Sequence, residues 1–335
     1  MTEVFYLCHF AVYYVIISKK LQFEVHIDSL IKVLEIIMPI FVTIALGMLA
    51  RKQSIMTDEA NKGLQQFVMK FCLPCVLFNS CLTGNFGMES VTAMALVIPL
   101  VILSSLWSFR IRKKKYPYHN LPQIFSSQET GMLGIPLFMT LFGAAQAYRM
   151  GVLDLAQSVI AIPVIAILSA DTGENPSPRY VAKKVLQSPL LLMSVLGLVL
   201  NLSGAIGVLN QIGIGGVITE VTGFLAQPVS AVILFCVGYN FSLGKENRRH
   251  VFEICGLHFL VFGIICAIIQ VIFFFVPSVD AETRWSILLY CALPGSYLTA
   301  SLGKTKEESA VAANVCSVLT VVCLIIFCVM AAIVS

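Results

Sequence analysis

The sequence predicts an all-α polytopic membrane protein of ten transmembrane helices in two inverted five-helix repeats. Hydrophobic residues make up 58% of its 335 residues and charged residues only 12%, against roughly 25% charged in soluble domains. The mean hydropathy is +0.89. Ten apolar stretches are separated by short loops, and the lysines and arginines gather in alternate loops. These observations favour a membrane bundle over a soluble domain.

Each expected helix is an apolar stretch close to the ~20 residues that cross a bilayer. The expected segments are 31–50, 63–83, 88–109, 121–146, 150–170, 188–205, 219–242, 251–276, 285–302 and 308–333. The fourth and ninth are uneven, because each divides into two half-length pieces around a proline. The chain therefore divides into a first repeat at 29–170, a loop at 171–187 and a second repeat at 188–335.

The loop charges predict the orientation, since cytoplasmic loops carry an excess of Lys and Arg. In the loops between the ten expected helices, sixteen basic residues lie on one side, and only Arg149 and Arg284 lie on the other. We expect the first side, including the loop at 171–187, in the cytoplasm, with both ends of the ten-helix core outside. The location is then the cytoplasmic membrane of the cell. The net charge of +4 comes from loop anchors and indicates no nucleic-acid partner.

Prolines and glycines recur in the same order in the two halves. The matched pairs are Pro39 with Pro189, Gly47 with Gly197, Pro74 with Pro228, and Pro136 with Pro294. Because each half has an odd number of helices, the second half must insert upside down relative to the first. Coincidence is the alternative, since proline is frequent in membrane helices.

Residues 1–28 do not fit this arrangement. Their apolar stretch at 4–18 is shorter than the ~17–25 residues of a span. Lys19, Lys20 and Lys32 follow it and would lie outside. No basic region precedes the stretch and no clear cleavage site follows it, which argues against a signal peptide. We expect an interfacial appendage or the product of an upstream translation start, and a folded protein after deletion of residues 1–27.

Paired helix breaks mark the candidate site. Proline lacks an N–H and glycine leaves helical geometry easily. Unwound backbone in a membrane lines a cavity or is buried in protein. There the N-terminal ends of half-helices can face an anion, and the freed carbonyl groups can bind a cation or a proton donor. A simple proline kink is the alternative, and it is our interpretation of Pro99 and Pro163. The expected substrate- or ion-binding residues are Glu129, Thr130, Gly131, Gly134, Pro136, Asp154, Pro294, Gly295, Ser296 and Tyr297.

Among the acids inside expected spans, where an ionisable group costs roughly 2.5–3.5 kcal/mol, Glu129 and Asp154 lie nearest the first break. A low dielectric disfavours a charged carboxylate, which suits Glu129 to proton binding and release; the alternative is a glutamate that reaches water at a helix end. Asp154 is assigned a coupling or pairing role, the alternative being an interfacial residue. Lys70 is expected to extend to the cytoplasmic face, the alternative being a pair with Glu129.

Other motifs are discounted. Cys72 and Cys75 have the C-x-x-C spacing of redox sites, but they lie inside an apolar helix without a second pair. The five histidines form no cluster, and no phosphate-binding loop or nucleophile–base arrangement is recognisable. We therefore expect no metal, no cofactor and no enzymatic activity.

The segments 130–137, 71–74 and 292–294 resemble the auxin efflux carrier family, which includes plant auxin exporters and bacterial malate or malonate permeases. The resemblance covers about residues 29–335 and favours the bacterial branch. It implies a scaffold and a transport unit in each protomer and elevator-like alternating access. The fourth and ninth helices would cross, with an organic carboxylate at the crossing.

Two positions depart from that family. Glu129 stands where many members have asparagine, and Thr299 stands where many have a second proline. A carboxylate at position 129 would repel an anion unless it were protonated. Either Glu129 binds a proton together with the substrate, or the substrate is not the usual anion.

We expect a secondary active transporter that moves a small organic acid across a lipid bilayer. Its coupling ion would be a proton or sodium, and a homodimer is one possible assembly. Glu129 would couple, while Ser296, Tyr297 and the half-helix ends would contact the substrate. The alternative is a non-transporting ligand sensor that uses the same crossing. Short cytoplasmic loops and the lack of a soluble output domain argue against that alternative.

Overall fold

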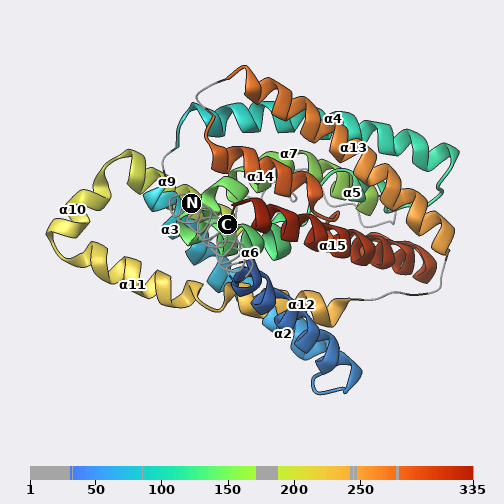
Figure 1. The fold of residues 1–335 in the computed structure, drawn as a ribbon, viewed down its shortest axis with the longest axis horizontal. Helices are drawn as coiled ribbons and strands as arrows, with labels where there is room; N and C mark the ends of the chain where they lie inside the picture. The colour runs from blue at the N-terminus through green and yellow to red at the C-terminus, as the bar shows by residue number, and fades with distance from the viewer. Residues whose placement is uncertain are drawn as a thin grey trace, which may run out of the picture.

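The computed structural model describes residues 31, 33–84, 86–170, 188–241, 244, 247–276 and 279–334. The expected appendage at 1–28 and the loop at 171–187 lie outside these ranges. The described residues are helical, apart from connections and one isolated antiparallel bridge between Gln128 and Gly295. Figure 1 shows the helices packed as a bundle.

Seven helices of the described part are long and apolar enough to cross a membrane. They are Val33–Lys52, Asp58–Thr83, Met88–Lys114, Ala144–Ile165, Ile214–Asn240, Arg248–Phe274 and Lys306–Val334. An eighth span results if α9 (Pro189–Leu202) and α10 (Ala205–Gln211), which meet at 81°, count as one. The chain is therefore a multi-pass membrane protein, while the number ten remains a prediction.

Several of these spans contain more than one element. The second comprises α2 (Asp58–Phe67), the π-helix η1 (Val68–Cys72) and α3 (Leu73–Thr83). The next are α4 (Met88–Lys114) and α7 (Ala147–Ala170), which follows the short η3 (Ala144–Gln146). The later ones are α11 (Ile214–Ala226) with α12 (Val229–Asn240), then α13 (Arg248–Phe274) and α15 (Lys306–Val334).

The expected fourth and ninth helices are short pieces. The fourth consists of α5 (Leu121–Ile124), the π-helix η2 (Thr130–Gly134) and α6 (Ile135–Phe142). The ninth consists of α14 (Ala281–Ala292) and the 3-10 helix η4 (Tyr297–Leu302). Since none of these pieces approaches 20 residues, they fall outside the seven spans.

The break in the fourth segment does not lie at Pro136, where the sequence predicted it. Pro294 lies between the two pieces of its segment, but Pro136 stands in the first turn of α6, within the continuous helical stretch Thr130–Phe142. Proline at a first turn removes no hydrogen bond that the helix needs. Pro74 stands in the same way at the start of α3, after a π-helix. The non-helical residues of the fourth segment are instead 125–129.

The helices form two groups (Figure 1). The first group comprises Val33–Lys52, α2, α3 and α9 to α12, and the second comprises α4 to α7 and α13 to α15. Within the first group, glycines allow backbones to touch. A Cβ atom at Gly238 would lie 2.0 Å from the carbonyl oxygen of Ile44, and one at Gly197 would lie 2.5 Å from that of Phe78. Such small-residue contacts are the usual means of close helix packing in membranes.

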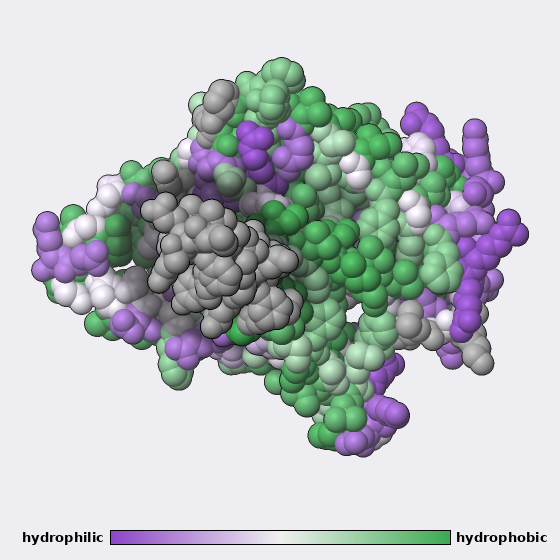
Figure 2. Space-filling view, viewed as in Figure 1, coloured by the Kyte–Doolittle hydropathy of each residue, from purple (hydrophilic) through white to green (hydrophobic). Residues whose placement is uncertain are grey.

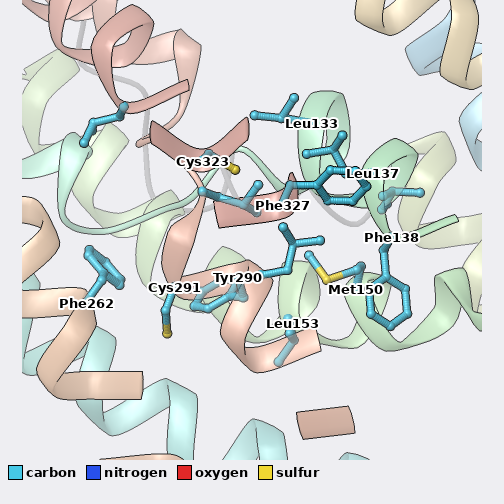
Figure 3. Packing of buried hydrophobic residues seen from close by; sticks show 14 of the residues in the cluster. Leu133, Leu137, Phe138, Met150, Leu153, Phe262, Tyr290, Cys291, Cys323 and Phe327 are labelled. Atoms are coloured by element: carbon cyan, nitrogen blue, oxygen red, sulfur yellow. The ribbon is translucent and has the colours of Figure 1, made fainter. Parts of the chain in front are cut away.

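The second group contains a dense apolar core. Figure 3 shows Tyr290 of α14, Phe262 of α13 and Phe327 of α15 among the buried side chains packed between the helices. On the outside, large apolar residues such as Phe274 are exposed, as expected where lipid replaces water. Figure 2 shows hydrophilic residues gathered at the right-hand rim, where α4 ends and α13 begins, and mainly hydrophobic residues beside it.

Candidate functional site

The two non-helical segments, residues 125–129 and 293–296, lie side by side and antiparallel; we call this pair the crossover. The N–H of Glu129 donates to the carbonyl oxygen of Pro294 at 2.9 Å, and the N–H of Ser296 donates to that of Ser127 at 3.0 Å. These bonds flank the bridge between Gln128 and Gly295. The backbone groups freed by the breaks thus bond to one another, as unwound backbone at membrane depth requires.

Gln157 of α7 extends this pairing with its side chain. Its Oε1 accepts the N–H of Gln128 at 2.7 Å, and its Nε2 donates to the carbonyl oxygen of Gln128 at 2.9 Å. The hydroxyl of Tyr290 also donates to Oε1, at 3.1 Å. The side-chain amide of Gln157 therefore bonds both the N–H and the carbonyl oxygen of Gln128, as the peptide group of a neighbouring β-strand would. Its position one turn after Asp154 was the only sequence signal for this role.

The side chain of Gln128 joins the first break to the second and to α13. In the amide orientation that satisfies its neighbours, its nitrogen donates to the carbonyl oxygen of Leu293 at 2.8 Å and to Nε2 of His258 at 3.1 Å. His258 is fully buried. Sequence reasoning assigned neither Gln128 nor His258 to the site, because their relation depends on packing between distant helices.

The acids Glu129 and Asp154 have separate surroundings. The Oε2 atom of Glu129 accepts the N–H of Tyr297 at 2.6 Å, across the crossover. Asp154 of α7 instead accepts the Thr130 hydroxyl and, at 3.0 Å, the Nε2 of Gln157. Glu129 lines a cleft, and Asp154 is not among the residues that line it. The side chains of the two acids therefore contact different groups.

A cleft of about 690 Å³ lies between the two groups of helices. This volume lies within the roughly 300–1,000 Å³ typical of small-ligand sites. Its polar residues include Lys62, Gln65 and Asn240 from the first group and Glu129, Ser296 and Ser301 from the second. Thr320 and the apolar Met69, Met132 and Val237 also contribute. The cleft thus combines a cation and a carboxyl on walls from different helix groups.

The expected site residues separate into those that face the cleft and those that shape the chain. Glu129, Ser296 and Tyr297 line the cleft. Pro294 and Gly295 belong to the crossover, where a Cβ atom at Gly295 would lie 2.9 Å from the carbonyl oxygen of Ile124.

Of the remaining expected residues, Thr130 and Asp154 are hydrogen-bonded to each other, and Gly131, Gly134 and Pro136 act by packing. Gly134 allows Met150 and Leu293 to approach, since a Cβ atom there would lie 2.7 and 2.8 Å from their side chains. Gly131 lies beside Met69, and Pro136 is buried in α6. Lys70 is exposed, and it is Lys62, expected only as a loop charge, that lines the cleft with Glu129.

Both arginines expected on the outer side are held by protein groups. Arg149 pairs with Asp280 through Nη1 at 2.9 Å and Nη2 at 2.5 Å, joining the start of α7 to the start of α14. Arg284 donates to the carbonyl oxygen of Phe273 at 2.6 Å. Although burial raises the pKa of Asp280, hydrogen bonds from Thr283 and the charge of Arg149 hold it below its usual range.

We expect Asp280→Asn to lower the free energy of unfolding by roughly 1–3 kcal/mol at neutral pH, as for other charge-assisted hydrogen bonds. Because the folded-state pKa is lowered, the stabilisation is present above the unfolded pKa of about 3.9 and is lost as the pH falls through the folded value. Thermal unfolding from pH 7 to pH 3 should show the difference between wild type and variant shrinking. Glu282→Gln, in the same first turn of α14, is the control; a constant difference would contradict this role for Asp280.

A family model described as "Membrane transport protein" matches residues 32–334. The match includes both segments of the crossover and every helix that the structure describes from Val33 onward. No curated protein matches the chain.

Proposed function

The chain belongs to the membrane transport protein family, and from this premise we propose that it is a secondary active transporter of a small organic acid. The malate or malonate class is our first choice of substrate. The observation that carries the proposal is the cleft between the two helix groups, which is lined by Glu129 and Ser296 of the crossover and by Tyr297 directly after it. A cleft at such an interrupted pair of helices is the usual place for a transporter's substrate.

The charges of the cleft support an acidic substrate bound together with a proton. Lys62 offers a positive charge on the first helix group, and the hydroxyls of Ser296 and Ser301 offer hydrogen bonds. An ionised Glu129 would repel a carboxylate by about 4 kcal/mol at 4 Å in a medium of dielectric constant 20. Protonation of Glu129 removes this repulsion. In the proposal, proton and substrate therefore bind together.

We also propose that the chain forms two inverted repeats, and two pairs of contacts support this. The matched glycines make matched contacts: Gly47 lies against α12 of the second half, and Gly197 lies against α3 of the first half.

Helix ends are capped in the same reciprocal way. Arg51 donates to the carbonyl oxygens of Tyr239 and Phe241, at the end of α12, at 3.3 and 3.2 Å. Asn201 donates to those of Cys81 and Gly84, at the end of α3, at 2.9 and 2.8 Å. Each half thus caps a helix of the other half, as a two-fold pseudo-symmetry requires.

The position of the cleft supports the elevator-like movement that we propose. The first helix group would be the scaffold, and the second group, which carries the whole crossover, would be the transport unit. Because the walls of the cleft come from both groups, displacement of one group along the other would open it to alternate sides. The distribution of loop charges supports an orientation with Lys62 on the cytoplasmic side. Alternating access by such movement of one bundle against another is common in repeat-built transporters.

Flux measurements test this function. We expect proteoliposomes containing the purified protein to accumulate labelled malate or malonate when the outer solution is more acidic. A protonophore should abolish the accumulation, and empty liposomes are the control. If dicarboxylates and aromatic acids stabilise the protein against heat but none is transported, the chain is a binding protein and the proposal is wrong.

A further inference from the structure

Three oxygen atoms converge on one point behind the crossover, on Nε2 of Gln157. They are the carbonyl oxygen of Gln128 at 2.9 Å, the hydroxyl oxygen of Thr130 at 2.9 Å and Oδ1 of Asp154 at 3.0 Å. Gln128, Thr130 and Gln157 are each at most 3% exposed. We call the three oxygens the cage.

The cage contains more acceptors than its present occupant can satisfy. An amide nitrogen has two hydrogens, so one of the three oxygens has no hydrogen from Gln157. A carboxylate, a hydroxyl and a backbone carbonyl are the hard oxygen ligands that alkali and alkaline-earth cations prefer. The amide nitrogen of Gln157, which has only a partial positive charge, therefore lies among three oxygens of the kind that coordinate cations.

The charge of Asp154 is not balanced by a basic residue among the described contacts. Its side chain accepts from Thr130 and Gln157, which are both neutral. Both bonds end on Oδ1. Asp154 is half-buried, and a carboxylate withdrawn from water normally has a partner of opposite charge or coordinates a metal ion. One carboxylate balances one positive charge, which points to a monovalent ion.

We propose that the cage formed by Gln128, Thr130 and Asp154 binds a monovalent alkali cation, which displaces the amide of Gln157. The cation would tie α7 to the first break on the side away from the substrate cleft. Since Gln157 also pairs with the peptide group of Gln128, its displacement would change how the crossover is held. The proposal deepens the proposed function, because it assigns ion coupling to Asp154 in addition to the proton on Glu129.

Thermal unfolding of the purified full-length protein tests the cage without requiring transport. Choline chloride is replaced stepwise by NaCl or by KCl at constant ionic strength and pH. A ligand that binds the folded state raises the unfolding temperature in a saturable way. We expect this with at least one of the two salts, and an at least tenfold weaker apparent affinity in Asp154→Asn.

Matched variants distinguish the ligands from the surroundings. Thr130→Val removes a cage oxygen and should weaken the cation effect, while Thr130→Ser keeps the hydroxyl and should retain it. Glu220→Gln should also retain it, because Glu220 is exposed on α11 of the first helix group. Equal unfolding temperatures in all three salts, or an unchanged cation effect in Asp154→Asn, would overturn the proposal. The proposal would also be overturned if the stabilisation depended on Asp154 and on pH but not on the cation, because the cage would then bind a proton. A saturable cation effect without flux of any organic acid would instead contradict only the proposed function.

Discussion

Replacement of Glu129 by glutamine is expected to make uptake nearly independent of pH while leaving the protein folded. Glutamine can still accept the N–H of Tyr297, which Glu129 binds at 2.6 Å, but it cannot bind and release a proton. We expect the ratio of uptake at low pH to uptake at high pH to fall by about tenfold, equivalent to roughly 1.4 kcal/mol. Initial rates in proteoliposomes at fixed external pH values measure this ratio.

Two control variants interpret that result. Glu129→Asp keeps an acid at the cleft and should keep a pH-dependent rate. Glu220→Gln removes the same charge from an exposed position on α11 and should behave as wild type. If Glu129→Gln retains the full pH dependence, coupling does not reside at Glu129, and the asymmetry between an acidic first break and a hydroxyl-bearing second break has another explanation.

Replacement of Gly238 by alanine is expected to be among the most destabilising single changes in the chain. The new Cβ atom would lie 2.0 Å from the carbonyl oxygen of Ile44 and 2.7 Å from its carbon. Overpacking usually costs about 1–3 kcal/mol. Because the opposing atoms are backbone, we expect a loss at or above the upper end of this range. Thermal unfolding in detergent measures it.

The repeat predicts a matched effect at the counterpart helix contact, where Gly197 of α9 meets α3. Gly197→Ala brings a Cβ atom to 2.5 Å from the carbonyl oxygen of Phe78 and should also be strongly destabilising. Gly223→Ala is the control, because a Cβ atom at Gly223 of α11 would meet nothing within 4 Å. Alanine's higher helix propensity should make that variant neutral or slightly stabilising, by up to ~1 kcal/mol. Similar losses for Gly223→Ala and Gly238→Ala would show that the close helix contact is not what matters.

Much of the architecture could be predicted because it follows from local properties. Apolar length located the seven spans that the structure describes, which coincide with expected segments to within a few residues at most ends. Some helix ends differ from the expected ones: α4 continues to Lys114, five residues past its expected end at 109. Its last turn contains Arg112, Lys113 and Lys114, cations that interact favourably with the C-terminal end of the helix dipole.

The candidate site could be predicted only in part. The position of Pro136 indicated a break nearby, but the nature of the break depended on a π-helix that lets the proline begin α6 without a lost hydrogen bond. Gln157 and Lys62 were not among the expected site residues. A single amide on an apolar helix, or a single lysine in a loop, does not indicate a binding site until its spatial neighbours are known. Their roles depend on contacts between segments far apart in the chain.

By itself the sequence determined the class of protein, the family and the approximate extent of each span, because these depend on composition, length and short motifs. Only the tertiary structure decided that Glu129 faces a cleft with Tyr297, while Asp154 faces Thr130 and Gln157. The physical reason is the pairing of residues 125–129 with residues 293–296. Once those two segments hydrogen-bond to each other, Glu129 is held beside the N–H of Tyr297, while Gln128 and Thr130 are held beside Gln157 of α7.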